Sequence, residues 1–186
     1  MTDGVLTRLI ERCDAATAAA DPIAAVRDAL AAVAEQPERA LAEVPEFDGE
    51  DHVLHRGEDL SVFVVRQTPD TAGPPHDHGM SAVIAMLDGV EIHRHYQREG
   101  DGVVLEREET VGPGEILTLG PRDVHAIANP DDTASLGIHV YLGDIVGNDR
   151  TLWDPDSGSA MPFTLADYER MVTPWRQTAA AGSTPS

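Results

Sequence analysis

The chain has 186 residues, 41% of them hydrophobic, which suits one domain with a good core and an appended helical segment. Its 33 acidic residues against 13 basic ones give a formal charge of −20. That balance argues against nucleic acid or an anionic membrane as a partner, because both require clustered Lys and Arg. The single cysteine, Cys13, excludes an intramolecular disulfide and is expected to be a buried, apolar-like thiol.

The N-terminal residues lack the basic head and apolar run that are typical of a signal peptide. No apolar run approaches the roughly 18 residues that suggest a membrane span. These two observations predict a cytoplasmic protein.

Residues 1–44 are expected to form an N-terminal helical segment. Val5, Leu6 and Leu9 recur at helical spacing, which predicts a helix with one apolar face. Asp21 followed by Pro22 is typical of a helix N-cap with proline at the first helical position. We therefore expect a second helix to begin there.

Residues 45–160 are rich in short runs of Val, Ile and Leu that are separated by Gly, Pro and Asp. This pattern predicts strands over 60–67, 81–88, 91–98, 115–119 and 136–143. No long helices fit between them, which disfavours a parallel α/β sheet and favours a β-sandwich or barrel. Residues 161–186 are expected to form a C-terminal tail with a short helix over 165–172 and a disordered end.

Three of the eight histidines suggest a metal site. His76 and His78 are two residues apart, so on a strand both imidazoles would point to the same face. His125 follows a strand and a tight turn and begins another strand. Together they predict a three-His centre with open coordination positions. Because such a centre is neutral, a divalent ion keeps its full charge and favours an anionic thiolate or carboxylate.

Glu91, His93 and His95 offer an alternative set of ligands on one predicted strand. They span about 13 Å at about 3.3 Å per residue, which is too far for one ion unless the strand bends. We therefore predict that they line the outer face of the strand. His52 and His55 are interpreted as ordinary polar surface residues.

The spacing of these histidines resembles the two motifs of the cupin superfamily. His76, His78 and Gly89 match the first motif, although Ala82 and Val83 stand where its glutamate would be. The second motif is matched by Gly114, His125 and Asn129, while Gly120 and Arg122 replace its usual proline and glycine. The resemblance implies a mainly β fold, the cupin double-stranded β-helix or jelly-roll barrel, after the helical N-terminal segment.

A narrower resemblance, over about residues 55 to 155, is to the cysteine dioxygenase family of thiol dioxygenases. It is carried by H-D-H-G-M at 76–80, D-V-H-A-I-A-N at 123–129 and I-H-V-Y at 138–141. The resemblance implies that His76, His78 and His125 bind iron(II) and that a small thiol and O₂ react to give a sulfinate. It also implies catalytic roles for His139 and Tyr141, although Gly137 replaces the serine of the family's Ser-x-His-x-Tyr relay.

Two arginines are candidates for binding a substrate carboxylate. Arg150 stands eleven residues after His139, as the carboxylate-binding arginine does in the mercaptopropionate dioxygenases that the chain resembles. Arg56 is the rival, because cysteine-specific members carry their arginine on an early strand. Arg150 could equally be an exposed loop residue.

The sequence leaves the substrate open among cysteine, 3-mercaptopropionate, mercaptosuccinate, cysteamine and ergothioneine. Two other functions also stay open. One is a three-His metal cupin that acts on another small organic acid as a dioxygenase or isomerase. The other is a non-catalytic cupin that binds a ligand or a metal.

Overall fold

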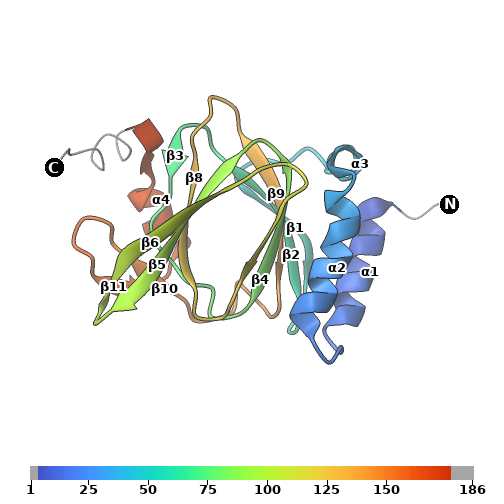
Figure 1. Ribbon diagram of the computed structural model, residues 1–186, viewed down its shortest axis with the longest axis horizontal. Coiled ribbons are helices and arrows are strands. Elements are labelled where there is room, and N and C mark those ends of the chain that lie inside the picture. The colour runs from blue at the N-terminus through green and yellow to red at the C-terminus, as the bar shows by residue number, and fades with distance from the viewer. Residues whose placement is uncertain (1–3, 177–186) are drawn as a thin grey trace.

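The computed structural model describes residues 4–176. Along the chain, three helices come before a barrel of two sheets (Figure 1). The helices are α1 Val5–Ala16, α2 Pro22–Ala34, α3 Pro37–Leu41 and α4 Leu165–Met171. The strands are β1 Asp51–Arg56, β2 Ser61–Gln67, β3 Thr71–Ala72, β4 Ala82–Asp88, β5 Glu91–Glu99, β6 Gly102–Val111, β7 Ile116–Leu119, β8 Val124–Asn129, β9 Ser135–Tyr141, β10 Thr151–Trp153, β11 Ala160–Pro162 and β12 Thr173–Pro174. The tail predicted to be disordered, residues 177–186, lies outside the described residues.

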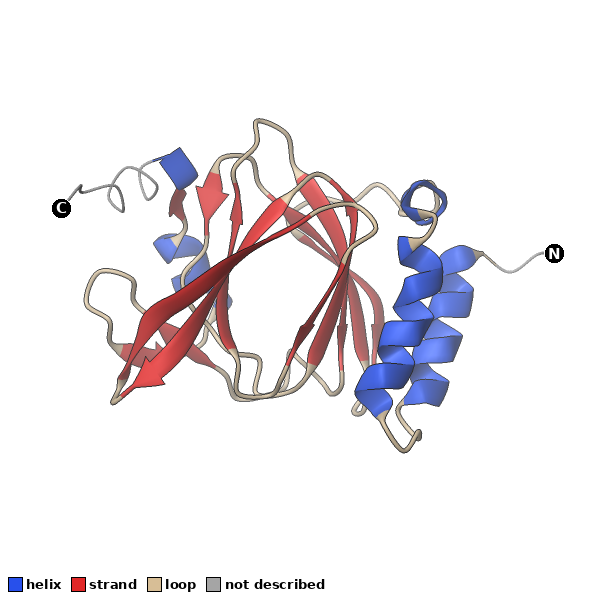
Figure 2. Ribbon diagram, in the orientation of Figure 1, coloured by secondary structure: helices blue, strands red, loops and turns tan. Residues whose placement is uncertain are grey.

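Two antiparallel five-stranded sheets enclose the interior (Figure 2). One has the order β1-β2-β9-β4-β7 and the other β12-β3-β8-β5-β6, while β10 and β11 form a separate ribbon. Two facing antiparallel sheets of this kind are the jelly-roll architecture of cupins. The predicted fold class, a mainly β double-stranded β-helix with N-terminal helices, is therefore confirmed.

The second helix begins where its N-cap predicts. Pro22 is its first residue, and the Asp21 carboxylate accepts a hydrogen bond from the Ala24 amide at 3.1 Å. The helical segment breaks once more, at Gln36, because Pro37 fits the first turn of a helix but not its interior. A short third helix, which the sequence pattern did not separate from the second, starts there.

Helices α1, α2 and α3 cover the outer face of the first sheet. Leu9 and Leu30 share one hydrophobic cluster with Val83 of β4, and all three side chains are buried. Its neighbour Ile84 points the other way, into a second cluster inside the barrel. Because β4 is buried on both faces, its sequence is a continuous apolar run instead of an alternating one.

The predicted burial of Cys13 is confirmed, since its side chain is fully enclosed in the helix-facing cluster. Burial raises the pKa of this thiol to about 12, and a neighbouring Arg12 offsets only part of the effect. The thiolate, which is the reactive form of cysteine, is therefore scarce at neutral pH.

Strand β6 is the main strand that the sequence pattern did not predict. It lies at the edge of its sheet and pairs with β5 along its whole length. Six of its ten residues are exposed, including the apolar Val104 and Leu105, so its strand structure depends on backbone pairing instead of burial. Hydropathy patterns report burial and therefore do not detect such a strand.

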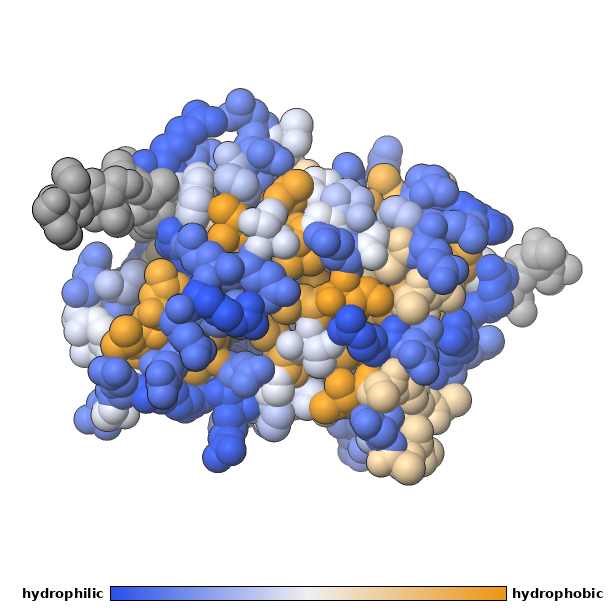
Figure 3. Space-filling view, viewed as in Figure 1, coloured by the Kyte–Doolittle hydropathy of each residue, from blue (hydrophilic) through white to orange (hydrophobic). Residues whose placement is uncertain are grey.

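Hydrophilic residues cover much of the face shown in Figure 3, with hydrophobic residues interspersed over the barrel. Within residues 4–176, no helix has the length and apolar character needed to cross a bilayer.

Candidate metal centre

The structure brings His76, His78 and His125 together inside the barrel. One ring nitrogen from each lies within 4.8 Å of the other two, and all three residues are buried. The Nε2 atoms of His78 and His125 are 3.4 Å apart. Imidazole nitrogens lie about 2.0–2.1 Å from an ion such as zinc, so two ligands at a tetrahedral angle are about 3.4 Å apart. The spacing therefore fits one shared ion.

The segment that carries His76 and His78 is a strap between two strands and not the regular strand that the sequence suggested. His76 forms a bridge to His125, with N–H···O distances of 2.8 and 3.0 Å in the two directions, and a second bridge to Leu152. Asp77 lies between the two histidines, and its carboxylate accepts hydrogen bonds from the Thr151 amide and from Arg98. These contacts fix the strap to β8 and β10.

Burial keeps the three imidazoles neutral. It lowers the pKa of His76 to about 4 and those of His78 and His125 well below their usual value. Metal binding needs an unprotonated nitrogen, so the site requires no loss of protons at neutral pH. The Nδ1–H of His76 can donate to the Pro74 carbonyl at 3.1 Å, which leaves Nε2 free as a ligand. Imidazole ligands suit iron as well as zinc, copper and nickel, so the residues fit the iron(II) that the resemblance implies.

A small cavity of about 90 Å³ lies beside the histidines. His76 and His78 line it together with Tyr141 and Arg150. Its size restricts it to a small molecule. The cavity thus joins two of the candidate metal ligands, His76 and His78, to the candidate substrate-binding residue Arg150.

The candidate catalytic pair, His139 and Tyr141, also faces this cavity. The two residues lie two apart on β9, so both side chains point into the barrel while Val140 between them packs toward the helices. His139 Nδ1 lies 3.2 Å from the Tyr141 hydroxyl. Burial raises the pKa of Tyr141 and lowers that of His139 to about 4, so both side chains are neutral at pH 7.

The other ring nitrogen of His139 lacks the partner that a serine at position 137 could provide. Among the described residues, His139 Nε2 has no hydrogen-bond partner although it is buried. A Cβ atom placed on Gly137 would lie 3.4 Å from this nitrogen. The substitution of the relay serine by Gly137 therefore leaves one side of the imidazole without a hydrogen bond from its own strand.

The two candidate arginines occupy different environments. Arg150 lines the cavity, and its guanidinium carbon lies 3.7 Å from the centre of the Phe163 ring. Burial lowers its pKa, but a guanidinium stays charged at neutral pH. Arg56 instead forms a two-point ion pair with Asp144, at 2.8 and 2.9 Å, and 46% of its side chain is exposed. The residues that line the cavity do not include Arg56.

Two carboxylates, Glu50 and Asp51, share the cavity with Arg150. Burial raises the pKa of Asp51, as does the neighbouring Glu50, whereas Arg150 lowers it. The cavity therefore holds one half-buried cation beside two acidic groups, an arrangement that sequence reasoning did not anticipate.

The prediction that Glu91, His93 and His95 line the outer face of their strand is wrong. The exposed fractions of the three residues are 0, 0 and 7%, and their side chains point into the barrel. Strand β5 pairs with β8 so that His95 lies opposite His125. The sequence E-I-H-R-H-Y places polar residues on both faces of β5, so hydropathy alone could not show which face was buried.

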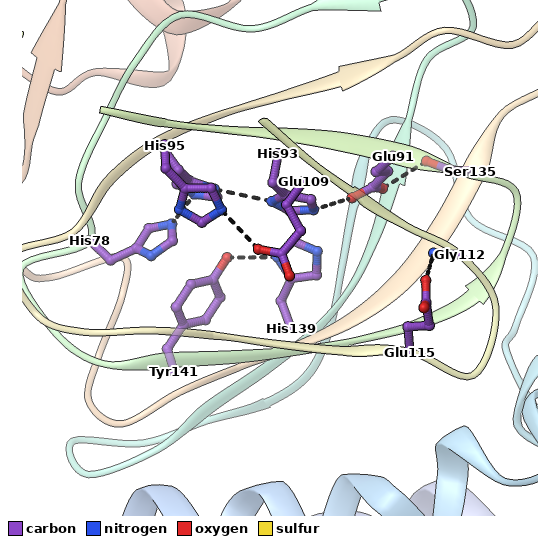
Figure 4. Close-up of polar contacts among 11 residues, drawn as sticks. His78, Glu91, His93, His95, Glu109, Gly112, Glu115, Ser135, His139 and Tyr141 are labelled. Carbon is purple, nitrogen blue, oxygen red and sulfur yellow. Dashed lines mark hydrogen bonds and ion pairs between the residues drawn. The ribbon is translucent and has the colours of Figure 1, made fainter. Parts of the chain in front are cut away.

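His93 is in contact with the candidate ligand His125, and Glu91 is in contact with His93 (Figure 4). His93 Nδ1 lies 3.2 Å from His125 Nδ1, and His93 Nε2 lies 3.1 Å from a Glu91 oxygen. Burial is the largest single effect on the pKa of Glu91 and would raise it. The hydrogen bonds from His93 and Ser135 and the electrostatic interactions with His93 and His139 together outweigh burial, so the pKa is lowered. Among residues 4–176, His76, His78 and His125 are the single cluster with metal-ligand spacing, so Glu91 and His93 adjoin this centre without forming another.

The histidines outside the barrel interior, His52 and His55, are neither fully exposed nor buried. Both lie on β1, and the ring of His52 packs against Phe47 at a centroid distance of 5.3 Å. Neither residue lines the cavity.

The two facing sheets and the three converging histidines define a double-stranded β-helix with a candidate three-His metal centre. No protein-family model matches the chain. An uncharacterized conserved protein with a double-stranded β-helix domain from Klebsiella pneumoniae is similar at 18% identity and TM-score 0.45, over 60% of this chain and 85% of that one. A cupin superfamily protein from Desulfitobacterium hafniense is similar at 13% identity and TM-score 0.44, over 56% and 86% of the two chains. The DMSP lyase DddQ from Ruegeria pomeroyi is similar at 17% identity and TM-score 0.46, over 84% and 80%.

Proposed function

We propose that this protein is a non-haem iron(II) thiol dioxygenase that converts a small thiol and O₂ into a sulfinate. The observation that carries the proposal is a centre of three buried, neutral imidazoles beside a cavity of about 90 Å³ that contains Tyr141 and Arg150. A neutral ligand set leaves the charge of a divalent ion uncompensated, which favours an anionic sulfur. One thiolate and one O₂ give one sulfinate, so the reaction needs no other reductant.

His76, His78 and His125 would hold the iron, which supplies the redox chemistry between the thiol and O₂. Tyr141 keeps its phenolic proton because burial raises its pKa, so it can donate a hydrogen bond into the cavity. The 3.2 Å contact with His139 fixes the direction of the Tyr141 hydroxyl. Arg150 provides a planar cation that suits a substrate carboxylate. The cavity of about 90 Å³ favours small thiols over bulky ones.

A second candidate function keeps the metal and changes the substrate. Arg150 would suit any small carboxylate, so a cupin that acts on another organic acid is also consistent with the cavity. A cupin that only binds a metal or ligand is a third candidate. The two enzymatic functions differ in whether the sulfur of a thiol is oxidised. Both convert a substrate, whereas the third function involves binding without turnover.

The first experiment is anaerobic reconstitution of the purified protein with iron(II). Close to one iron per chain is expected, and Ala variants of His76, His78 and His125 should each lose it. His52→Ala is the matched control, because His52 lies outside the cavity and should leave the iron content unchanged. Full iron binding by the three variants would refute the assignment of the site.

The second experiment measures O₂ uptake by the iron-loaded protein with a panel of thiols and of small acids that lack sulfur. The panel includes cysteine, 3-mercaptopropionate, mercaptosuccinate, cysteamine and ergothioneine. At least one thiol should give one sulfinate for each O₂ consumed, as quantified by mass spectrometry. Iron-loaded protein that oxidises none of the thiols but consumes O₂ with an acid would support the second candidate function instead.

A further inference from the structure

A buried carboxylate and a buried histidine lie directly behind the candidate ligand His125. Glu91 and His93 are both 0% exposed, although ionisable side chains are rarely buried without a partner. The Glu91 carboxylate lies 3.1 Å from His93 Nε2 and accepts a hydrogen bond from the Ser135 hydroxyl at 2.7 Å (Figure 4). His93 in turn reaches His125 through its Nδ1 atom, at 3.2 Å. The four side chains form one continuous hydrogen-bonded row.

The direction of the hydrogen bonds in this row follows from the metal site. His125 Nε2 faces His78 Nε2 at 3.4 Å, so Nε2 is the atom that would bind an ion and must carry no proton. The proton of His125 then resides on Nδ1 and is donated to His93 Nδ1. His93 Nδ1 is therefore an acceptor, which places the proton of His93 on Nε2, where it is donated to Glu91. Every donor in the row meets one acceptor.

The two imidazole planes are inclined by only 10°, with ring centroids 5.4 Å apart. The Nδ1–H of His125 can thus point at the lone pair of His93, which lies in the plane of that ring. This geometry fixes the rotation of the His125 ring as well as its tautomer. The negative charge of Glu91 is connected to the metal site through His93, although Glu91 itself contributes no ligand atom to it.

We propose that Glu91 and His93 are positioning residues that fix the tautomer and orientation of His125 and strengthen its binding of the metal. A hydrogen-bonded carboxylate behind a ligand histidine raises the basicity of the ligand nitrogen. The three-imidazole centre carries no charge of its own, and Glu91 supplies a buried negative charge through His93. The inference rests on the metal site of the proposed function and is independent of the identity of the substrate.

A purely structural role in the barrel core is the competing explanation. The same strand offers a matched control, because His95 Nε2 lies 3.2 Å from a Glu109 oxygen. This second pair also joins a histidine of β5 to a glutamate, but no contact between either residue and the Nδ1 atom of His125 is present. Loss of the Glu109 charge should therefore leave the orientation of His125 unchanged.

The test is the affinity of the metal-free protein for cobalt(II) alone, measured by competition with a chelator, and the visible absorption bands of the cobalt form. Glu91→Gln keeps the shape of the side chain and removes its charge. It should lower the cobalt affinity about 10- to 100-fold and shift the absorption bands. Glu109→Gln should change neither by more than about twofold. Urea unfolding of each metal-free variant reports any change in the stability of the fold.

Two outcomes would overturn the proposal. One is a Glu91→Gln affinity within twofold of the original protein, and the other is an equal loss in Glu91→Gln and Glu109→Gln. If Glu91→Gln does not fold, Ser135→Ala, which removes the hydrogen bond to the same carboxylate, should still weaken cobalt binding, and unchanged binding would overturn the proposal. Failure of the metal site itself is distinguishable, because His78→Ala would then bind cobalt as tightly as the original protein.

Discussion

Arg150→Gln should raise the Michaelis constant for a mercapto-acid by roughly ten- to a hundredfold. The charge of Arg150 lies in the same cavity of about 90 Å³ as His76 and His78, so a small substrate at the metal is within its reach. A hydrogen bond to a charged group is worth about 1.5–3 kcal/mol, and about 1.4 kcal/mol corresponds to a factor of ten. Glu50 and Asp51 stay in the cavity after the substitution and repel the carboxylate, which favours the upper end of the range.

The assay is steady-state O₂ uptake with 3-mercaptopropionate and, in parallel, with cysteamine, which has no carboxylate. The substitution should change the Michaelis constant for 3-mercaptopropionate and have little effect on that for cysteamine. Arg56→Gln is the matched control, because an exposed ion pair such as Arg56–Asp144 is worth about 0–1 kcal/mol and lies outside the cavity. Equal effects of Arg150→Gln on both thiols, or a larger effect of Arg56→Gln, would refute the carboxylate clamp.

Three further predictions concern the tyrosine, the acid stability and a turn of the barrel. Tyr141→Phe should lower the turnover number about 10²–10⁴-fold at unchanged iron content, and an unchanged rate would reduce Tyr141 to a packing residue. The pKa of His139 falls from 6.5 to about 4 on folding, so its contribution to stability is complete above pH 6.5 and is lost as the pH falls toward 4. In urea unfolding of the metal-free protein, protonation of His139 should lower the free energy of unfolding by about 2 kcal/mol between pH 7 and pH 5. The His139→Gln variant should lack this contribution, and identical pH dependence of the two proteins would contradict the assignment. Gly89→Ala should lower the melting temperature by more than about 4 °C, because Gly89 has φ +69° and a Cβ there would lie 2.8 Å from the Ser135 Cα. Gly100→Ala, at φ +59° with open space around it, should lower the melting temperature less, and an equal effect would refute the steric argument.

The sequence determined the class of fold because most of its strands are apolar runs between turn residues. Strand β4 is an example: its run of buried residues could be recognised without knowledge of its partners. The edge strand β6 could not, because most of its residues are exposed and carry no signal of burial. The three candidate ligands were predicted from the H-D-H pair and from His125 at the start of another strand. The structure brings them together although His76 and His78 lie on a strap and not on the regular strand that the two-residue periodicity assumes.

The same two-residue periodicity placed His139 and Tyr141 on one face of β9, but only the helices packed on the other face decided that this face is the interior. The tertiary structure also decided between Arg150 and Arg56 as lining of the cavity, since the two lie on segments far apart in the sequence. The contact between His93 and His125 spans 32 residues and depends on the register between β5 and β8. A strand with polar residues on both faces gives no local indication of which face is buried. The neighbouring strands decide which face is buried, and they thereby place the row of hydrogen bonds behind the candidate metal centre.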